Sequence, residues 1–284
     1  MKYNTIYLVC ILSIFAKIGL AQSFVSTIPF SEEINWKNVE IKNQEDLKST
    51  FLTQIKDFDR LVKENYCTKK ELLNYLHVVD FNGDSFFDII YEGPSGAEPN
   101  MIVIYLNSEN GFKEIFNDWQ GISKIEMHEG KFSGLYIDDP GCCGDPGAFM
   151  KYYSISYQGS TPKFIQIIES RYFNGCNSVL PKKSFDKPIK FRVNNDNYNL
   201  RFAPEVNDKY GHCWDEMKGN IIGVINKSEI GYALDEITDS KGKTWWFVAF
   251  PPKTNFSFLE YGEYEDESYW ELGWISSSFV TKIK

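Results

Sequence analysis

The stretch Asp80-Phe81-Asn82-Gly83-Asp84-Ser85-Phe86-Phe87-Asp88-Ile89-Ile90-Tyr91 decides how the first half of this chain folds. It places an oxygen-bearing side chain at every second position of a short loop and runs directly into the largely apolar segment Phe86–Tyr91. Such spacing points several oxygens at one centre, as a hard cation with about six to eight oxygen ligands requires. The stretch therefore predicts a calcium loop followed at once by a β-strand.

The expected calcium ligands are the side chains of Asp80, Asn82, Asp84 and Asp88 and the backbone carbonyl oxygen of Phe86. Three carboxylates around a divalent ion leave about one negative charge in excess. The spacing is that of a structural site, and it gives no indication of catalysis.

The composition of the chain favours β structure. Aromatic residues make up 16% of the 284 residues, with 22 Phe, 17 Tyr and 7 Trp, and these residue types favour pleated, half-buried surfaces. The length suits roughly two domains. A net charge of -9, with no cluster of Lys and Arg, argues against a nucleic-acid partner, because phosphate binding needs clustered cations.

The N-terminus has the order of a secretory signal peptide. Lys2 precedes the apolar run 6–16, and the small residues of segment 19–21 stand before Gln22, so residues 1–21 are expected to be removed. The run is too short for a membrane anchor, which takes about 20 apolar residues. The mature protein is predicted to be exported, periplasmic or secreted, and not an integral membrane protein.

Disulfides persist in such a compartment. Removal of Cys10 with the signal peptide leaves five of the six cysteines, namely Cys67, Cys142, Cys143, Cys176 and Cys213. Because five is odd, at least one thiol has no partner within the chain. We expect Cys176 to pair with Cys142 or Cys143. The alternative is a zinc site that adds His212 to the last four cysteines, but adjacent cysteines lack the spacer of about two to four residues that zinc ligands need.

Two helices are expected ahead of the calcium loop. The first carries an apolar stripe at helical spacing, formed by Leu47, Phe51, Ile55, Phe58 and Val62. The second starts at a Thr-x-x-Glu capping box made by Thr68 and Glu71. Both helices are expected to pack on the sheet that follows.

After the loop, short apolar segments alternate with turn residues, which indicates an antiparallel meander. The expected strands are 86–91, 101–106, 112–116, 123–127, 132–137, 150–157 and 164–172. The polar segment 176–196 is predicted to link a first domain, 22–175, to a second, 197–284. The predicted fold class is mainly β, with an α+β N-terminal part.

The loop at Asp80 resembles the calcium loops of FG-GAP and VCBS propeller-type repeats, whose pattern is Asp-x-Asn-Gly-Asp-Gly-x-x-Asp before an apolar strand. Ser85 stands where glycine is usual, and positive φ at a residue with a side chain costs of order 1 kcal/mol. An EF-hand would instead continue as a helix with Glu at the position of Tyr91. One copy of the loop is found, so the resemblance implies a calcium site without a complete propeller.

Residues 197–284 resemble a bacterial Src-homology-3 domain. The segments that follow the order of that family are Asn199-Leu-Arg-Phe-Ala-Pro204, Ile222-Gly-Val-Ile225, Trp245-Trp-Phe-Val248, and Gly273-Trp-Ile275 with Ser278-Phe-Val280. The resemblance implies a small all-β barrel and, in many relatives, recognition of cell-wall peptides or envelope proteins. The insertions 206–219 and 251–269 depart from the pattern in loops, where specificity usually resides, so the family's ligand cannot be carried over.

Aromatic side chains are the expected contacts for an extended peptide. The candidates are Trp245, Trp246, Tyr261, Tyr264 and Trp274. Neighbours in a strand face opposite sides, so one of Trp245 and Trp246 is expected in the core and the other on the ligand side. The acids of segment 260–267 would favour a cationic partner.

Catalytic motifs are missing from the sequence. His212 and Cys213 are neighbours within an insertion, and His77 and His128 accompany no nucleophile motif. We therefore expect an exported, non-enzymatic binding protein that recognises a peptide or protein of the cell envelope and carries one structural calcium ion. The alternative is a cell-wall hydrolase, or an accessory subunit of one, because this barrel often accompanies cell-wall cysteine peptidases.

Overall fold

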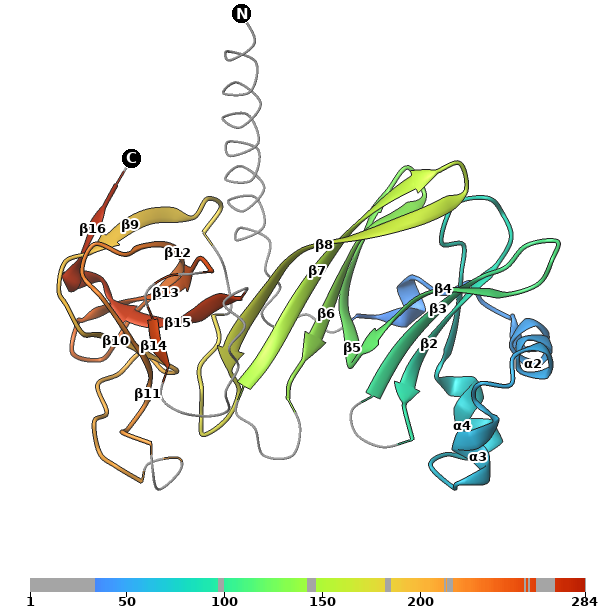
Figure 1. Cartoon of the computed structure of the whole chain (residues 1–284), viewed down its shortest axis with the longest axis horizontal. Helices are drawn as coiled ribbons and strands as arrows, with labels where there is room; N and C mark the ends of the chain where they lie inside the picture. Colours follow the sequence, from blue (N-terminus) through green and yellow to red (C-terminus); the bar gives the residue numbers. More distant parts are fainter. Residues whose placement is uncertain are drawn as a thin grey trace, which may run out of the picture. The chain divides into compact units, whose positions relative to one another are not determined.

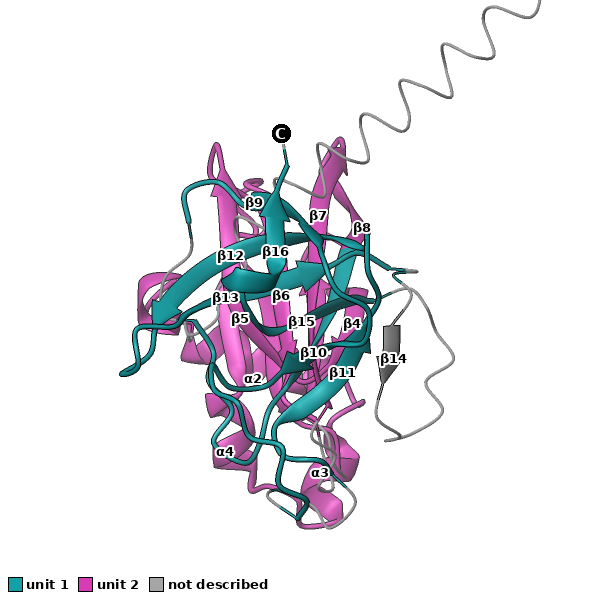
Figure 2. Ribbon diagram, turned by 90° about the vertical axis from the view of Figure 1, so that its left-hand side faces the viewer, with its two compact units in different colours: residues 1–31, 168–284 teal, residues 32–167 magenta. Residues whose placement is uncertain are grey.

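The computed structural model describes residues 34–96, 100–141, 147–181, 185–211, 213, 217–252, 254, 256–258 and 269–283. The expected signal peptide and the expected site residues Tyr261, Tyr264, Cys142 and Cys143 lie outside these ranges. The chain forms two compact units, coloured separately in Figure 2. Unit 1 comprises residues 1–31 and 168–284, and unit 2 comprises residues 32–167.

Helical segments open unit 2 (Figure 1). They are η1 (Trp36–Asn38), α2 (Glu45–Gln54), α3 (Asp59–Lys63) and α4 (Lys69–Asn74). The expected first helix is split, because Ile55 leaves the helical conformation with ψ of 118°. The capping box of α4 forms as expected: the Glu71 amide donates to Thr68 Oγ1 at 3.1 Å, and the Thr68 amide donates to a Glu71 carboxylate oxygen at 2.7 Å.

The strands of unit 2 pair antiparallel with their sequence neighbours in two groups. The first group is a four-stranded sheet in the order β1 (Leu76–Val79), β2 (Asp88–Pro94), β3 (Asn100–Leu106) and β4 (Lys113–Trp119). The second contains β5 (Gly121–His128), β6 (Lys131–Asp139), β7 (Gly147–Gln158) and the start of β8 (Thr161–Phe173). The protein is mainly β, as predicted, with antiparallel pairing within unit 2.

The core of unit 2 lies on both faces of the first sheet. On one face, Val103 and Tyr105 of β3 pack with residues of the helices, and the Phe51 and Tyr105 rings lie 5.0 Å apart. On the other face, Ile102 and Ile104 belong to a cluster with residues of β5 and β6. The alternation follows from the two-residue period of a strand. Packing on both faces holds β1 and β2 in place, and the acidic loop connects these two strands.

The remaining strands of the chain belong to unit 1. They are β9 (Ile189–Val193), β10 (Tyr198–Arg201), β11 (Ile221–Ile225), β12 (Ile230–Thr238), β13 (Thr244–Phe250), β14 (Phe256–Phe258), β15 (Trp270–Ser276) and β16 (Val280–Lys282), with the short helix η2 (Ser277–Phe279) before β16. Strand β9 lies inside the segment expected to be a linker, and the division between the units falls within β8.

Unit 1 was predicted to be a small β-barrel, and the strands that the structure describes there do not close into one. Their pairing runs β14-β11-β10-β15-β13-β12-β9-β16, with the end of β8 pairing parallel to β15, and the two end strands β14 and β16 each pair along one side. Strands β10 and β15 meet through a single residue pair, Arg201 with Trp274, next to a bulge after Leu200. The sheet of unit 1 is therefore open, because its two end strands, β14 and β16, do not pair with each other. No helix in the described ranges is long and apolar enough to cross a membrane.

Candidate functional site

The acidic loop joins β1 to β2 and is folded around its own carboxylates. Asp80 accepts hydrogen bonds from the amides of Asp84, at 3.1 Å, and Ser85, at 3.2 Å. Asp84 accepts one from the Phe86 amide at 2.9 Å. Gly83 and Ser85 have φ values of 69° and 70°. Ser85 therefore has the left-handed backbone conformation expected for it, because glycine occupies this position in the FG-GAP pattern.

Asp88 stands where the loop enters β2 and is fully buried. Its two oxygens accept the amides of Phe81 and Asn107, each at 2.8 Å. Burial raises the pKa of Asp88 to about 7, and the charges of Asp84 and Asp80 act in the same direction, although the two amide bonds lower it. The three carboxylates therefore repel one another across the loop, which a bound cation would relieve.

The donor chemistry of the loop suits calcium. All five expected donors are oxygens, which favours a hard ion over zinc, and a carboxylate oxygen that accepts one hydrogen bond keeps a second lone pair. Asn82 is buried and donates to Asp84 at 2.8 Å and to the Ser160 carbonyl at 3.0 Å. Among the described residues, no three or more His, Cys, Asp or Glu side chains are already grouped as a metal cage.

The three tryptophans named as candidate peptide contacts are all core residues. Trp245, Trp246 and Trp274 are 2%, 4% and 1% exposed, because β13 and β15 are covered on both faces. Their indole N–H groups donate within the protein: to Asp239 at 3.1 Å, to Glu236 at 3.2 Å and to the Val179 carbonyl at 2.5 Å, respectively. The expectation that one of the adjacent pair faces a ligand is therefore corrected.

The disulfide also differs from the expected pairing. Cys176 bonds to Cys213, 37 residues away, so it is not available to Cys142 or Cys143, and the zinc alternative loses two of its sulfurs. Cys67 is free and buried. Burial raises the pKa of its thiol, with the Glu71 charge adding to the effect, which opposes the thiolate form that a reactive cysteine needs.

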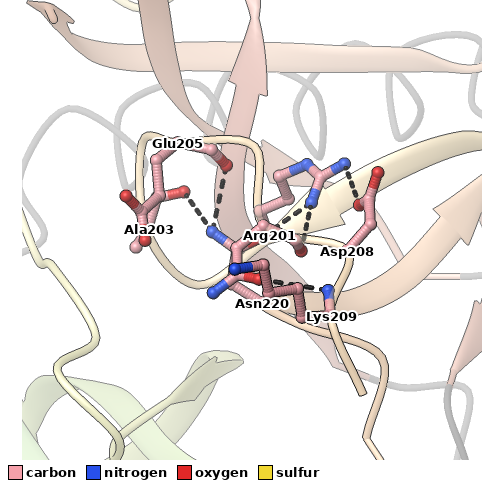
Figure 3. Close-up of polar contacts among 7 residues, drawn as sticks. Arg201, Ala203, Glu205, Asp208, Lys209 and Asn220 are labelled. Carbon is pink, nitrogen blue, oxygen red and sulfur yellow. Dashed lines mark hydrogen bonds and ion pairs between the residues drawn. The ribbon is translucent and has the colours of Figure 1, made fainter. Parts of the chain in front are cut away.

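The second candidate site is the segment 203–220, which contains the insertion 206–219 and which we call the insertion loop. The sequence did not indicate which of its residues are functional. Two buried polar side chains hold its base, as Figure 3 shows. Arg201 donates to Asn220 at 2.7 Å, to the Asn207 carbonyl at 3.1 Å and to Asp208 at 2.9 Å. Asn220 donates to the carbonyls of Ala203, at 3.2 Å, and Glu205, at 3.0 Å.

Gly219 closes the insertion loop at a position where no side chain fits. Its φ is 62°, and a Cβ atom built there would lie 1.8 Å from the Asn207 carbonyl oxygen. The Gly219 amide donates to the Lys209 carbonyl at 2.9 Å. Held in this way, the loop exposes Val206 by 59% and Tyr210 by 71%. The sequence located the insertion, but it gave no sign that Arg201 and Asn220 anchor it.

No family model matches the chain, and no curated protein or solved structure matches it. The acidic loop and the insertion loop, together with the two resemblances in the sequence, are therefore the features from which a function can be inferred.

Proposed function

We propose that this chain is an exported, non-enzymatic binding protein that recognises a peptide or protein of the cell envelope through the insertion loop of unit 1. The observation that carries the proposal is a loop fixed by buried Arg201 and Asn220 that nevertheless exposes Tyr210 by 71%. Tyr210 forms a β-bridge with Lys218 next to the base of this loop, and a contact residue held in place before binding loses less entropy when its partner arrives. Tyrosine is also among the side chains that dominate the energetics of protein interfaces.

Export is supported by the disulfide that ties the insertion loop to the rest of unit 1. Cys213 lies in the loop and Cys176 precedes β9. Disulfides of this structural kind are typical of proteins outside the reducing cytoplasm. The expected signal peptide at residues 1–21 agrees with that compartment.

The test is a pull-down from solubilised cell-envelope extract with the purified mature chain. We expect a partner that Tyr210→Ala binds about tenfold more weakly, because removing an interface anchor costs more than about 1.4 kcal/mol. Ile237→Ala, which removes a 42% exposed apolar side chain from β12, is the matched control and should bind like the wild type. Equal retention by Tyr210→Ala and wild type would remove the insertion loop from the proposal.

The same preparation distinguishes binding from hydrolysis. Incubated with purified cell-wall material, a binding protein leaves the polymer intact. Release of soluble fragments, lost on substitution of a single acidic or cysteine residue, would support the hydrolase alternative and count against a non-enzymatic role.

We further propose that the acidic loop of unit 2 binds calcium through Asp80, Asn82, Asp84, Asp88 and the Phe86 carbonyl. The ion would supply positive charge between carboxylates that repel one another. It would stabilise the folded state, because the loop has this arrangement only when folded. The role of the ion would be structural, since the side chains of Asp80, Asp84 and Asp88 already accept the hydrogen bonds that shape the loop between β1 and β2.

Calcium is expected to raise the melting temperature of unit 2. A concentration of about 100 times Kd corresponds to about 2.7 kcal/mol of added stability, measured by calorimetry in calcium and again in a chelator. Asp84→Asn should abolish the rise, because it removes one carboxylate charge from the donor set. Asp46→Asn, an exposed change in α2, should leave the rise intact. A wild-type melting temperature unmoved by calcium would contradict the metal assignment.

A further inference from the structure

Unit 2 contains a pocket of about 360 Å³ beside the edge strand of its four-stranded sheet. It lies over β3 and β4, and the break between α2 and α3 supplies a wall through Asp57 and Phe58. The volume is within the range of small-molecule sites, which is about 300 to 1,000 Å³. The pocket is separate from the acidic loop, and neither proposal above uses it.

The register of β3 and β4 explains what the pocket contains. Met101 pairs with Trp119, Val103 with Asn117, and Tyr105 with Glu114, and paired residues of an antiparallel ladder share a face. Val103 and Tyr105 belong to the core cluster on the helical face, and Met101 packs against it. The pocket therefore has an apolar floor from β3 and a polar and aromatic rim from β4.

Two carboxylates on the rim have neutral partners. Asp57 accepts a hydrogen bond from the Tyr105 hydroxyl at 3.1 Å, and Glu114 accepts one from the Asn117 amide group. Within the described residues, neither carboxylate forms an ion pair. Asp118 also lines the pocket, but its carboxylate is paired with Lys151 at 2.8 Å and accepts the Tyr153 hydroxyl at 2.7 Å.

Trp119 completes the rim and is 53% exposed. Two carboxylates meet near Tyr105, because Glu114 pairs with it in the register and Asp57 accepts its hydroxyl. This end of the pocket is suited to an organic cation, whose N–H groups the carboxylates can accept. Trp119 lies toward the other end, opposite Met101.

The apolar floor suits a short alkyl chain attached to that cation. We propose that the pocket binds an alkylammonium group, with its ammonium between Glu114 and Asp57 and its chain over Val103 and Met101 toward the Trp119 ring.

The test uses hexylammonium as the probe, with hexanol and hexanoate as neutral and anionic controls. Binding is followed in the ¹⁵N-labelled chain through the indole N–H resonance of Trp119, which is assigned by its loss in Trp119→Phe. We expect hexylammonium to shift this resonance with an affinity that falls as salt is added. Hexanol should bind at least tenfold more weakly, and hexanoate should not bind. Equal binding of hexanol, or no shift with hexylammonium, would overturn the proposal.

Variants separate the charge from the ring. Glu114→Gln should weaken hexylammonium binding about tenfold, as expected for a lost charged hydrogen bond. Trp119→Ala, measured by calorimetry, should weaken it about threefold to fivefold, because the ring covers the end of the alkyl chain. Met127→Ala removes a 54% exposed side chain from β5, outside the pocket, and should change nothing. Unchanged affinity in Glu114→Gln would also overturn the assignment.

Discussion

Replacing Trp274 by alanine is expected to lower the free energy of unfolding of unit 1 by about 3 to 5 kcal/mol, the usual cost of deleting a buried indole. The ring is 1% exposed and packs edge-on against Phe247, with ring centroids 5.2 Å apart. Its N–H group donates to the Val179 carbonyl, which would lose that donor. Because β15 is the central partner of β10 and β13, the damage should spread through the unit.

Chemical denaturation of the mature chain measures this loss. Trp274→Phe is a useful intermediate, because it keeps an aromatic ring while removing the N–H group, and it should lose less stability than Trp274→Ala. Ile237→Ala should remain within about 0.5 kcal/mol of the wild type, as exposed positions usually do. If Trp274→Ala retained wild-type stability but lost binding, Trp274 would be a ligand contact after all and its placement in the core would be wrong.

The second large effect is expected for Asn220→Ala at the base of the insertion loop. Asn220 is fully buried, and its amide group serves Arg201, Ala203 and Glu205 together. The substitution removes three hydrogen bonds, and the two to Arg201 and Ala203 are buried. A buried polar group that loses its partner costs about 1 to 3 kcal/mol. We expect unit 1 to lose about 3 kcal/mol or more and the insertion loop to become susceptible to limited proteolysis.

Asn195→Ala is the matched control, because this asparagine is exposed in a turn. It should stay close to the wild type in both measurements. An Asn220→Ala chain that resists protease and unfolds like the wild type would show that the disulfide alone holds the loop. Partner binding measured on the same variant then tests whether order in the loop is needed for recognition.

Local features were predictable from the sequence where neighbouring residues decide them. The capping box at Thr68 and Glu71 depends on a three-residue spacing, and the strand expected at 101–106 corresponds to β3 (Asn100–Leu106). The apolar stripe at helical spacing also predicted helical structure in the segment that forms α2 and α3. It could not show where the backbone leaves the helix at Ile55, because apolar spacing reports which residues are buried and not the ψ angle between them.

Long-range features were not predictable in the same way. A strand pattern places Trp245 and Trp246 on opposite faces, but it cannot show that both faces of β13 are covered. The bond between Cys176 and Cys213 joins positions that the spacing of the cysteines does not single out. The pocket depends on the register of β3 and β4, including a bulge between Ile104 and Tyr105. Each is a property of chain segments that meet only after folding.

The bond between Cys176 and Cys213 has a practical consequence for anyone who produces this protein. It is the only covalent link between the insertion loop and a distant part of the described chain, so a thiol reductant would loosen the loop without removing a single core side chain. A preparation from a reducing cytoplasm would therefore pass ordinary checks of secondary structure and still carry a loosened insertion loop. The redox history of a sample should be reported with every binding result.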